Sequence, residues 1–297
     1  MPIIRTPDER FKNLKDFPYT PHYIEIKGLR VHYIDEGSGE IILCLHGEPT
    51  WSYLYRKMIP LFVRAGFRVI APDFIGFGRS DKYTEQYEYT FKMHFKMLEN
   101  FLQKLEFTNI TLVCQDWGGL IGLPVAVKNS NRFARLVIMN TFLPTGEEKA
   151  TTGFWGWRNF AAQTDLIASL CVRGGTVTGN KLPQEVLDAY DAPFPDRSYK
   201  AGMQVFPLIV PTSPEMTGAS EMKKARERLS KWNKPALVMF SDSDPIMTGL
   251  DEFFRELIPT AKEQPKIIIK KASHFLQEDK GKEIAQHIID FIKRTPI

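Results

Sequence analysis

Short apolar runs alternate with amphipathic segments along most of the chain. Runs of four or five apolar residues are typical of strands buried on both faces of a sheet, and the segments between them repeat apolar residues at helical spacing. The predicted strands are Tyr23–Ile26, Val31–Ile34, Ile41–Leu45, Phe67–Ala71, Ile110–Val113, Arg135–Met139, Ala236–Phe240 and Lys266–Ile269. The predicted helices are Tyr53–Arg64, Phe91–Leu105, Leu120–Val127, Leu250–Leu257 and Glu283–Ile292. The first two strands are predicted to form an antiparallel hairpin. The regular alternation after them predicts an α/β fold, with a mostly parallel central sheet flanked by helices.

The alternation stops between residues 144 and 214. This stretch is rich in Trp, Phe, Pro and Gly and holds only short helical pieces, such as Lys181–Tyr190. Because the strand pattern resumes afterwards, we expect an insertion that packs over the C-terminal edge of the sheet. The predicted organisation is a core domain of residues 1–143 and 215–297 and a helical cap of residues 144–214.

Composition narrows the possible partners. The chain has 297 residues, of which 43% are hydrophobic and 25% charged, as in ordinary globular proteins. Its formal charge is +4, but the basic residues form no tract, which argues against nucleic-acid binding. The N-terminus, Met1–Phe17, is polar and charged and lacks the apolar region of a signal peptide, and no run of about 18 apolar residues indicates a membrane span. Three cysteines, Cys44, Cys114 and Cys171, have neither metal-ligand nor disulfide spacing, which favours a reducing, cytoplasmic location without a metal or other cofactor.

The segment around Asp116 has the pattern of a nucleophile elbow. A predicted strand ends at Val113, and Asp116 and Trp117 are followed by Gly118 and Gly119 just before the predicted helix at Leu120. Such a strand-to-helix turn exposes one side chain at the top of a parallel sheet, and the glycines let the backbones approach closely. The apex residue in this pattern is commonly Ser, whereas here it is Asp116.

Two further polar residues follow predicted strands. Asp244 comes shortly after Ala236–Phe240, and His274 comes after Lys266–Ile269. A single Asp in such a loop is more often a turn or capping residue. The order of nucleophile, acid and histidine is that of α/β-hydrolases, and ligands of open α/β sheets bind beyond the carboxyl ends of the strands. We therefore predict that Asp116, Asp244 and His274 form one catalytic site.

An aspartate at the apex changes the chemistry. Because its carboxylate is ionised near neutral pH, it can attack an sp³ carbon directly and form an alkyl ester. His274 would then activate a water that hydrolyses the ester, and Asp244 would fix the tautomer of His274. Backbone N–H groups at Trp117 and in the His46–Glu48 loop are placed to stabilise the resulting oxyanion.

A halide is the leaving group that suits this site. It needs no general acid, but it needs hydrogen-bond donors in a water-poor pocket, and an indole N–H can only donate. Trp117 adjoins the nucleophile, and the insertion supplies Trp155 and Trp157. The alternative is that these tryptophans only pack.

Three segments resemble haloalkane dehalogenases: His46–Arg56, Gln115–Gly119 and Ser273–Glu278. The likeness is strongest to the subgroup that has its acid after the strand following the cap and its second halide-binding Trp in the cap. It implies Asp116 as nucleophile, Asp244 as acid and His274 as base. The residues to which it assigns binding roles are Trp117 and Trp157 for halide, the backbone N–H groups of Glu48 and Trp117 for the oxyanion, and Leu120, Phe154, Phe206, Pro207 and Ile246 for the pocket.

The resemblance leaves some assignments open. Trp155 competes with Trp157 as the cap tryptophan, and Asn140 matches a position that holds the acid in another subgroup. Epoxide hydrolases share Asp-Trp-Gly-Gly and use cap tyrosines as acids, for which Tyr190 and Tyr199 are available. The long match over Glu48–Ser52 and the cap tryptophan favour dehalogenation.

The predicted activity is hydrolysis of a haloalkane to alcohol, halide and proton through an ester at Asp116. The expected partners are a small halogenated alkane and a halide ion, with no nucleic acid and no membrane, and the chain is expected to be a monomer. A ligand-binding protein without catalysis is a further alternative, but the complete Asp116, Asp244 and His274 set argues against it.

Overall fold

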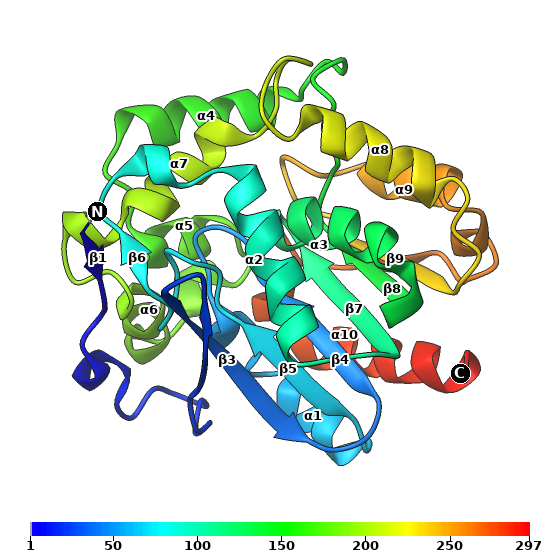
Figure 1. The fold of residues 1–297 in the computed structure, drawn as a ribbon, viewed down its shortest axis with the longest axis horizontal. Coiled ribbons are helices and arrows are strands. Elements are labelled where there is room, and N and C mark those ends of the chain that lie inside the picture. Colours follow the sequence, from blue (N-terminus) through cyan, green and yellow to red (C-terminus); the bar gives the residue numbers. More distant parts are fainter. Residues whose placement is uncertain (1) are drawn as a thin grey trace.

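The centre of the molecule is an eight-stranded sheet, seen in a computed structural model that describes residues 2–297 (Figure 1). The strand order is β10-β9-β8-β7-β4-β5-β3-β2. Only the β2–β3 and β3–β5 pairs are antiparallel. The bounds are β2 (His22–Ile26), β3 (Leu29–Gly37), β4 (Ile41–Leu45), β5 (Arg68–Pro72), β7 (Ile110–Gln115), β8 (Phe133–Met139), β9 (Ala236–Ser241) and β10 (Ile267–Ile269). The predicted α/β fold, its mostly parallel sheet and the β2–β3 hairpin are confirmed.

The register of the central strands brings their ends to one edge. Leu45 at the end of β4 lies beside Cys114, and Gln115 at the end of β7 lies beside Met139 at the end of β8. Every residue of β7 and β9 is buried, because helices cover both faces of the sheet. The loops that follow β4, β7 and β9 therefore start close together in space.

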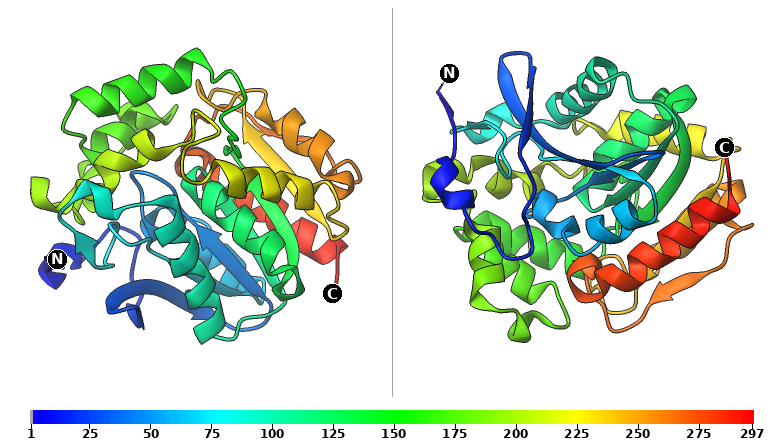
Figure 2. Two further views of the ribbon diagram at one scale, coloured as in Figure 1. Left: turned by 45° about the horizontal axis from the view of Figure 1, so that its top comes forward. Right: turned by 90° about the horizontal axis from the view of Figure 1, so that it is seen from below.

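Helices cover the sheet on its two faces. On one face α1 (Ile59–Arg64) packs against α10 (Leu276–Arg294). The other face carries α2 (Phe91–Lys104), α3 (Trp117–Lys128), α8 (Ala219–Leu229) and α9 (Leu250–Leu257). Figure 2 shows α1 and α10 together beneath the sheet in its right-hand view.

Four helices lie between β8 and α8 in the chain and are here called the inserted helices. They are α4 (Thr152–Gln163), α5 (Ala168–Gly174), α6 (Gln184–Asp191) and α7 (Ala201–Ile209). Helix α4 packs on α7, α5 packs on α6, and the group lies beyond one end of the sheet (Figure 2, left). Helix α7 also touches β6 (Lys82–Tyr83), which pairs with β1 (Ile3–Ile4) in a small separate sheet. The division into a core and a cap domain stays a prediction.

Two predicted helices differ from the structure, and one helix was not predicted. The single helix expected over Tyr53–Arg64 is wrong: a 3₁₀ turn at Ser52–Tyr55 is followed by α1, which restarts beside Pro60 because proline suits only the first turn of a helix. Helix α10 begins at Leu276 rather than Glu283. Helix α8 was not expected, because its many charged residues obscure the buried stripe formed by Met222, Ala225 and Leu229.

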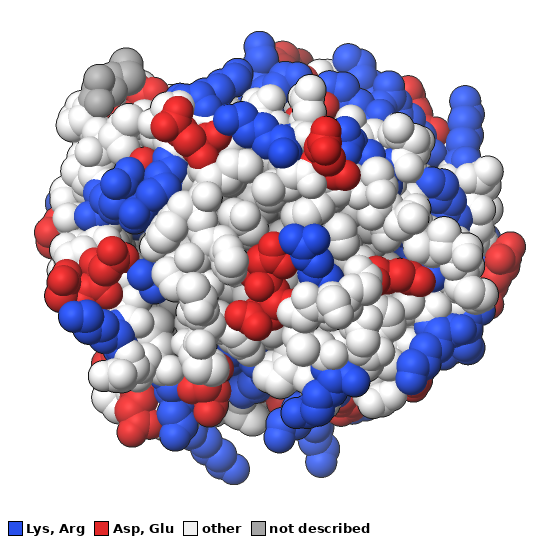
Figure 3. Space-filling model, turned by 60° about the horizontal axis from the view of Figure 1, so that its bottom comes forward, with Lys and Arg blue, Asp and Glu red and all other residues white. Residues whose placement is uncertain are grey.

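Charged side chains of both signs are interspersed on the face drawn in Figure 3, where neither sign gathers into one large patch. Within residues 2–297, no helix combines the length and the apolar character that crossing a membrane requires.

Asp73 follows β5 and joins several segments beside the site. It is fully buried, and its carboxylate accepts hydrogen bonds from His32 Nδ1 at 2.7 Å, Ser52 N at 2.8 Å and Arg79 N at 2.9 Å. Burial by itself would raise the pKa of Asp73, but the nearby histidines, His32 foremost, and the N–H donors outweigh it and lower that pKa to about 2. The ionised carboxylate thus holds β3, the 3₁₀ turn and the loop after β5 together.

Replacement of Asp73 by Asn should remove this charge. We expect Asp73→Asn to lower the free energy of unfolding by about 2–4 kcal/mol near neutral pH, since buried donors lose an ionised acceptor. The native pKa lies below the unfolded value, so the carboxylate stabilises the fold above about pH 4 and this contribution is lost as the pH falls towards about 2. Urea unfolding across this range should show the difference between wild type and variant shrinking at acid pH. A constant difference would contradict the assignment.

Candidate active site

Asp116 stands at the turn between β7 and α3 in a strained backbone conformation. Its φ is 51° and its ψ −129°, a region that non-glycine residues rarely occupy and that is often found at functional positions. A Cβ on Gly118 would overlap the backbone oxygen of Leu45, and one on Gly47 would overlap the Asp116 carboxylate. The glycines are needed because the elbow is packed directly against the loop after β4.

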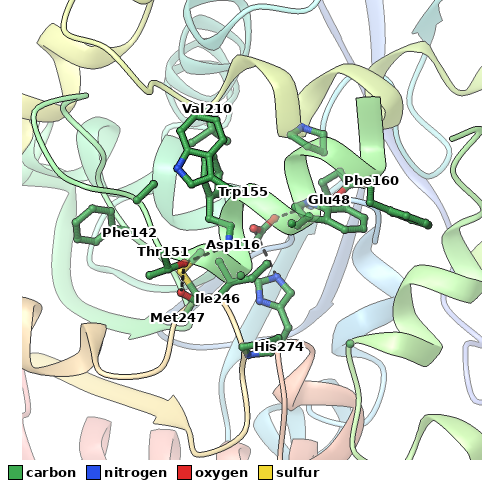
Figure 4. A pocket seen from close by; sticks show the side chains of 18 of the residues that line it. Glu48, Asp116, Phe142, Thr151, Trp155, Phe160, Val210, Ile246, Met247 and His274 are labelled. Carbon is green, nitrogen blue, oxygen red and sulfur yellow. Dashed lines mark hydrogen bonds and ion pairs between the residues drawn. The ribbon is translucent and has the colours of Figure 1, made fainter. Parts of the chain in front are cut away.

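The structure brings Asp116, Asp244 and His274 together. His274 Nδ1 lies 2.8 Å from Asp244 Oδ2, and His274 Nε2 lies 3.6 Å from Asp116 Oδ2. Figure 4 shows the Asp116 and His274 side chains pointing toward one another inside a pocket. The imidazole therefore stands between two carboxylates that come from the ends of different strands.

Asp244 is held as a carboxylate in a buried position. Its Oδ1 accepts from the backbone N–H groups of Ile246 at 2.8 Å and Met247 at 3.1 Å. Burial opposes ionisation, but His274 and these N–H donors outweigh it and lower the pKa of Asp244. The charge that faces His274 Nδ1 is thus built into the loop after β9.

Asn140 connects the acid to the elbow. Its amide donates to Asp244 Oδ2 at 2.8 Å and accepts from the Ser241 N–H at 2.9 Å, while its backbone oxygen accepts from the Asp116 N–H at 2.9 Å. It matches a family position, but the sequence did not indicate that it would bind both carboxylate-bearing residues. That role follows from the pairing of β7, β8 and β9.

The Asp116 carboxylate has a backbone donor from another strand end. The Glu48 N–H donates to Asp116 Oδ1 at 2.8 Å. Trp117 opens α3, so its N–H is among those that the helix itself leaves without a partner. Of the two N–H groups named as oxyanion donors, that of Glu48 is bonded to the Asp116 carboxylate, and that of Trp117 belongs to the next residue in the chain.

The Glu48 side chain lines the same pocket as Asp116, but its surroundings disfavour the charged form. It is only 4% exposed, and its Oε1 has no hydrogen-bond partner within residues 2–297. Burial, reinforced by the neighbouring Asp116, raises the pKa of Glu48 well above its usual value. The neutral form of the Glu48 side chain is therefore favoured beside Asp116.

A cavity of about 850 Å³ extends from Asp116 towards the inserted helices, within the size range of small-molecule sites. Apart from Asp116, Glu48 and His274 at one end, most of its wall is apolar. Four expected pocket residues line it, namely Leu120, Phe154, Pro207 and Ile246. Phe206 does not: its ring lies behind Trp117, with ring centroids 4.5 Å apart, because α7 turns it into the core.

The three tryptophans named from the sequence all line the cavity. Trp117 is buried, Trp157 is half-buried and packs against the core, and Trp155 is 42% exposed. Within residues 2–297 the indole N–H of Trp51 is bonded to Ala189 O at 3.1 Å, whereas the indole N–H groups of Trp117, Trp155 and Trp157 have no such acceptor. Their N–H groups are free to bind an anion.

The two tyrosines considered as acids lie elsewhere. Neither Tyr190 nor Tyr199 lines the cavity. Tyr190 is fully buried and donates to Glu278 Oε2 at 2.7 Å. Glu278 also receives two hydrogen bonds from Arg56, at 2.7 and 2.8 Å. Tyr190 thus joins α6 to α10, and its hydroxyl is unavailable to a substrate.

The site offers no obvious place for a metal. Across residues 2–297, no group of three or more His, Cys, Asp or Glu side chains is arranged to hold a metal ion. Asp116, His274 and a water could carry out a hydrolysis by themselves.

Residues 40–281 match a family model described as the alpha/beta hydrolase fold. This span covers most of the chain, so the protein is an α/β hydrolase.

Similar proteins show to which family of α/β hydrolases the chain belongs. The chain is 47% identical to a haloalkane dehalogenase of Psychrobacter cryohalolentis over 100% of both chains. It is 45% identical to one of Mycobacterium marinum, over 98% of this chain and 100% of that one. The solved structure of a haloalkane dehalogenase from Paraglaciecola agarilytica superposes with a TM-score of 0.91 at 38% identity over 97% of each chain. The chain belongs to the haloalkane dehalogenase family and is a hydrolase.

The hydrogen bond from Tyr190 to Glu278 predicts that the tyrosine hydroxyl stabilises the fold. We expect Tyr190→Phe to lower the free energy of unfolding by about 1–3 kcal/mol, because Glu278 loses a buried donor. Turnover should be nearly unchanged, since the hydroxyl does not reach the cavity. Thermal unfolding together with steady-state kinetics would test this. A large loss of kcat at unchanged stability would instead place Tyr190 in the chemistry.

Proposed function

We propose that the protein hydrolyses haloalkanes to an alcohol, a halide and a proton through an alkyl ester of Asp116. One observation carries the proposal: an aspartate at the elbow apex faces a histidine that is bonded to a second aspartate. Family membership supports the substrate class, and the cavity is apolar enough to receive an alkyl chain.

In the first step Asp116 Oδ2 attacks the carbon that bears the halogen. A C–O bond forms as the carbon–halogen bond breaks, and the halide leaves with the bonding electrons. The Glu48 N–H holds the other oxygen, Oδ1, which becomes the carbonyl oxygen of the ester. The indole N–H groups of Trp117 and Trp157 receive the halide, with Trp155 as the alternative second donor.

In the second step a water attacks the Asp116 carbonyl carbon. His274 Nε2 takes one proton from this water, and the negative charge on Oδ1 is stabilised by the N–H groups of Glu48 and Trp117. The imidazolium returns the proton to the departing alcohol oxygen, and the second water proton goes to solvent. Asp116 is thereby regenerated as a carboxylate.

Esterification also prepares His274 to act as a base. Burial would lower the pKa of His274, but Asp244 and Asp116 together outweigh it and raise that pKa to about 10. When Asp116 becomes a neutral ester, one of the two carboxylate charges is lost. The pKa of His274 therefore falls at the step in which the unprotonated ring is required.

The inserted helices act in this proposal as a cap that keeps water from the reacting atoms. Leu120, Phe154, Pro207 and Ile246 hold the alkyl chain, and Phe206 supports Trp117 from behind. No cofactor, nucleic acid or membrane takes part. The expected monomer and cytoplasmic location stay predictions, and the similar Paraglaciecola enzyme is described as tetrameric.

Removal of the base should trap the ester. With His274→Ala we expect one halide released per protein molecule and a mass increase equal to the alkyl group on Asp116, because alkylation needs no base. The measurement is intact mass spectrometry after incubation with 1,2-dibromoethane or 1-bromobutane. Asp116→Ala is the control and should neither release halide nor gain mass. Unmodified His274→Ala protein, with a substrate that the wild type turns over, would contradict the mechanism.

The two cap tryptophans can be separated by matched substitutions. Trp157→Phe should weaken bromide binding by about 10- to 100-fold, because a hydrogen bond to a charged group is lost. Trp155→Phe should leave it close to wild type, since that side chain is the more exposed of the two. Bromide titration monitored by tryptophan fluorescence would measure both. The opposite order of effects would assign the halide to Trp155.

A further inference from the structure

Gln115 makes contacts with the catalytic histidine that the mechanism above does not use. It is the last residue of β7, immediately before Asp116, and its side chain is fully buried. Its amide Nε2 lies 3.1 Å from His274 Nε2 and 3.2 Å from the His274 backbone oxygen. Its Oε1 has no hydrogen-bond partner within residues 2–297.

The backbone contact fixes how the amide is oriented. Only the NH₂ end of Gln115 can donate to the His274 carbonyl, so the same nitrogen directs its second N–H at the ring. A donor at His274 Nε2 suits only a ring in which this nitrogen is unprotonated, the form that is required once Asp116 has become an ester. The hydrogen of the neutral ring is then on Nδ1, where it is donated to Asp244.

The other groups around His274 act in the opposite direction. Asp244 and Asp116 are carboxylates on either side of the ring and favour the imidazolium. Glu48 also faces the site, but its neutral form is favoured and adds little. Phe275 presents an apolar ring. An imidazolium fixed between two carboxylates could not accept a proton from water, so Gln115 is the one neighbour among these that favours the base.

We propose that Gln115 is a positioning residue that holds His274 neutral, with Nε2 unprotonated, for the hydrolysis of the alkyl ester. This inference rests on the proposed function. The amide neither gains nor loses a proton. When the water arrives, it takes the place of the Gln115 N–H at Nε2, while the bond to the His274 carbonyl keeps the amide in position. The unpaired Oε1 is the unfavourable feature that this arrangement retains.

Gln115→Met tests the donor, because methionine is similar in length and has no N–H. Formation of the alkyl ester should proceed at the wild-type rate. Its hydrolysis near neutral pH should slow about tenfold, and the acid limb of that step should move up by about one pH unit, the size of one hydrogen bond in a proton equilibrium. The ester should accumulate during turnover and produce a halide burst. Rapid-quench halide assays and intact mass would follow the two steps separately across pH.

Two further variants make the experiment decisive. Gln115→Glu has nearly the same shape but adds a carboxylate, so it should shift the acid limb further in the same direction; it also serves if the methionine variant does not fold. Gln277→Met is the matched control, because Gln277 is a fully buried glutamine of α10 with no hydrogen bond to His274 within residues 2–297. Its pH profile should equal that of the wild type.

The outcomes separate the inference from the proposed function. An unchanged acid limb in Gln115→Met and Gln115→Glu would overturn the positioning role, as would equal slowing of both steps. If His274→Ala forms no ester, the proposed function fails whatever the Gln115 variants do. If it forms the ester while both Gln115 variants hydrolyse theirs like the wild type, only the present inference fails.

Discussion

The charge of Asp116 is the constraint on which the site depends. In the proposed mechanism the Asp116 carboxylate must be ionised and exposed to the cavity, yet it must not be fixed permanently in an ion pair with His274. The distance of 3.6 Å from His274 Nε2 meets this requirement, because it is longer than the 2.8 Å contact between His274 Nδ1 and Asp244. The strained φ of Asp116, the glycines around it and the Glu48 N–H all serve to keep the carboxylate there.

The same constraint links His274, the proposed base, to the rest of the fold. His274 lies just before α10, and Glu278 in the first turn of that helix is bonded to Arg56 and Tyr190. Burial disfavours the charge of Glu278, but Arg56 and Lys57 outweigh this and lower its pKa to about 2. Tyr190 belongs to the inserted helices, so one buried cluster fixes their position and that of the helix that follows the base. A shift of α6 would therefore be felt close to His274.

Much of the fold and part of the site could be predicted from local patterns in the sequence. Parallel strands such as Ile41–Leu45 were recognisable because burial on both faces of a sheet requires continuous apolar runs. The bounds of helix Leu250–Leu257 followed from the helical spacing of its apolar residues. Helix α8 was missed because its charged face dominates the sequence. Gln115 stood inside the elbow pattern, but nothing local indicates its partner, which lies 159 residues away.

The sequence by itself determined the order along the chain of the eight strands of the main sheet and of several helices, the elbow with its acidic apex, and the residues that follow the strand ends. These depend on periodicity and on the chemistry of neighbouring residues. Only the tertiary structure decided that Tyr190 binds Glu278 instead of facing the cavity, that Phe206 lies behind Trp117, and that Gln115 meets His274. The physical reason is that packing joins segments far apart in the chain, and a side chain can turn either to the core or to the cavity. The elbow pattern predicted the position of the proposed nucleophile, whereas the folded structure determined which residues hold the proposed base.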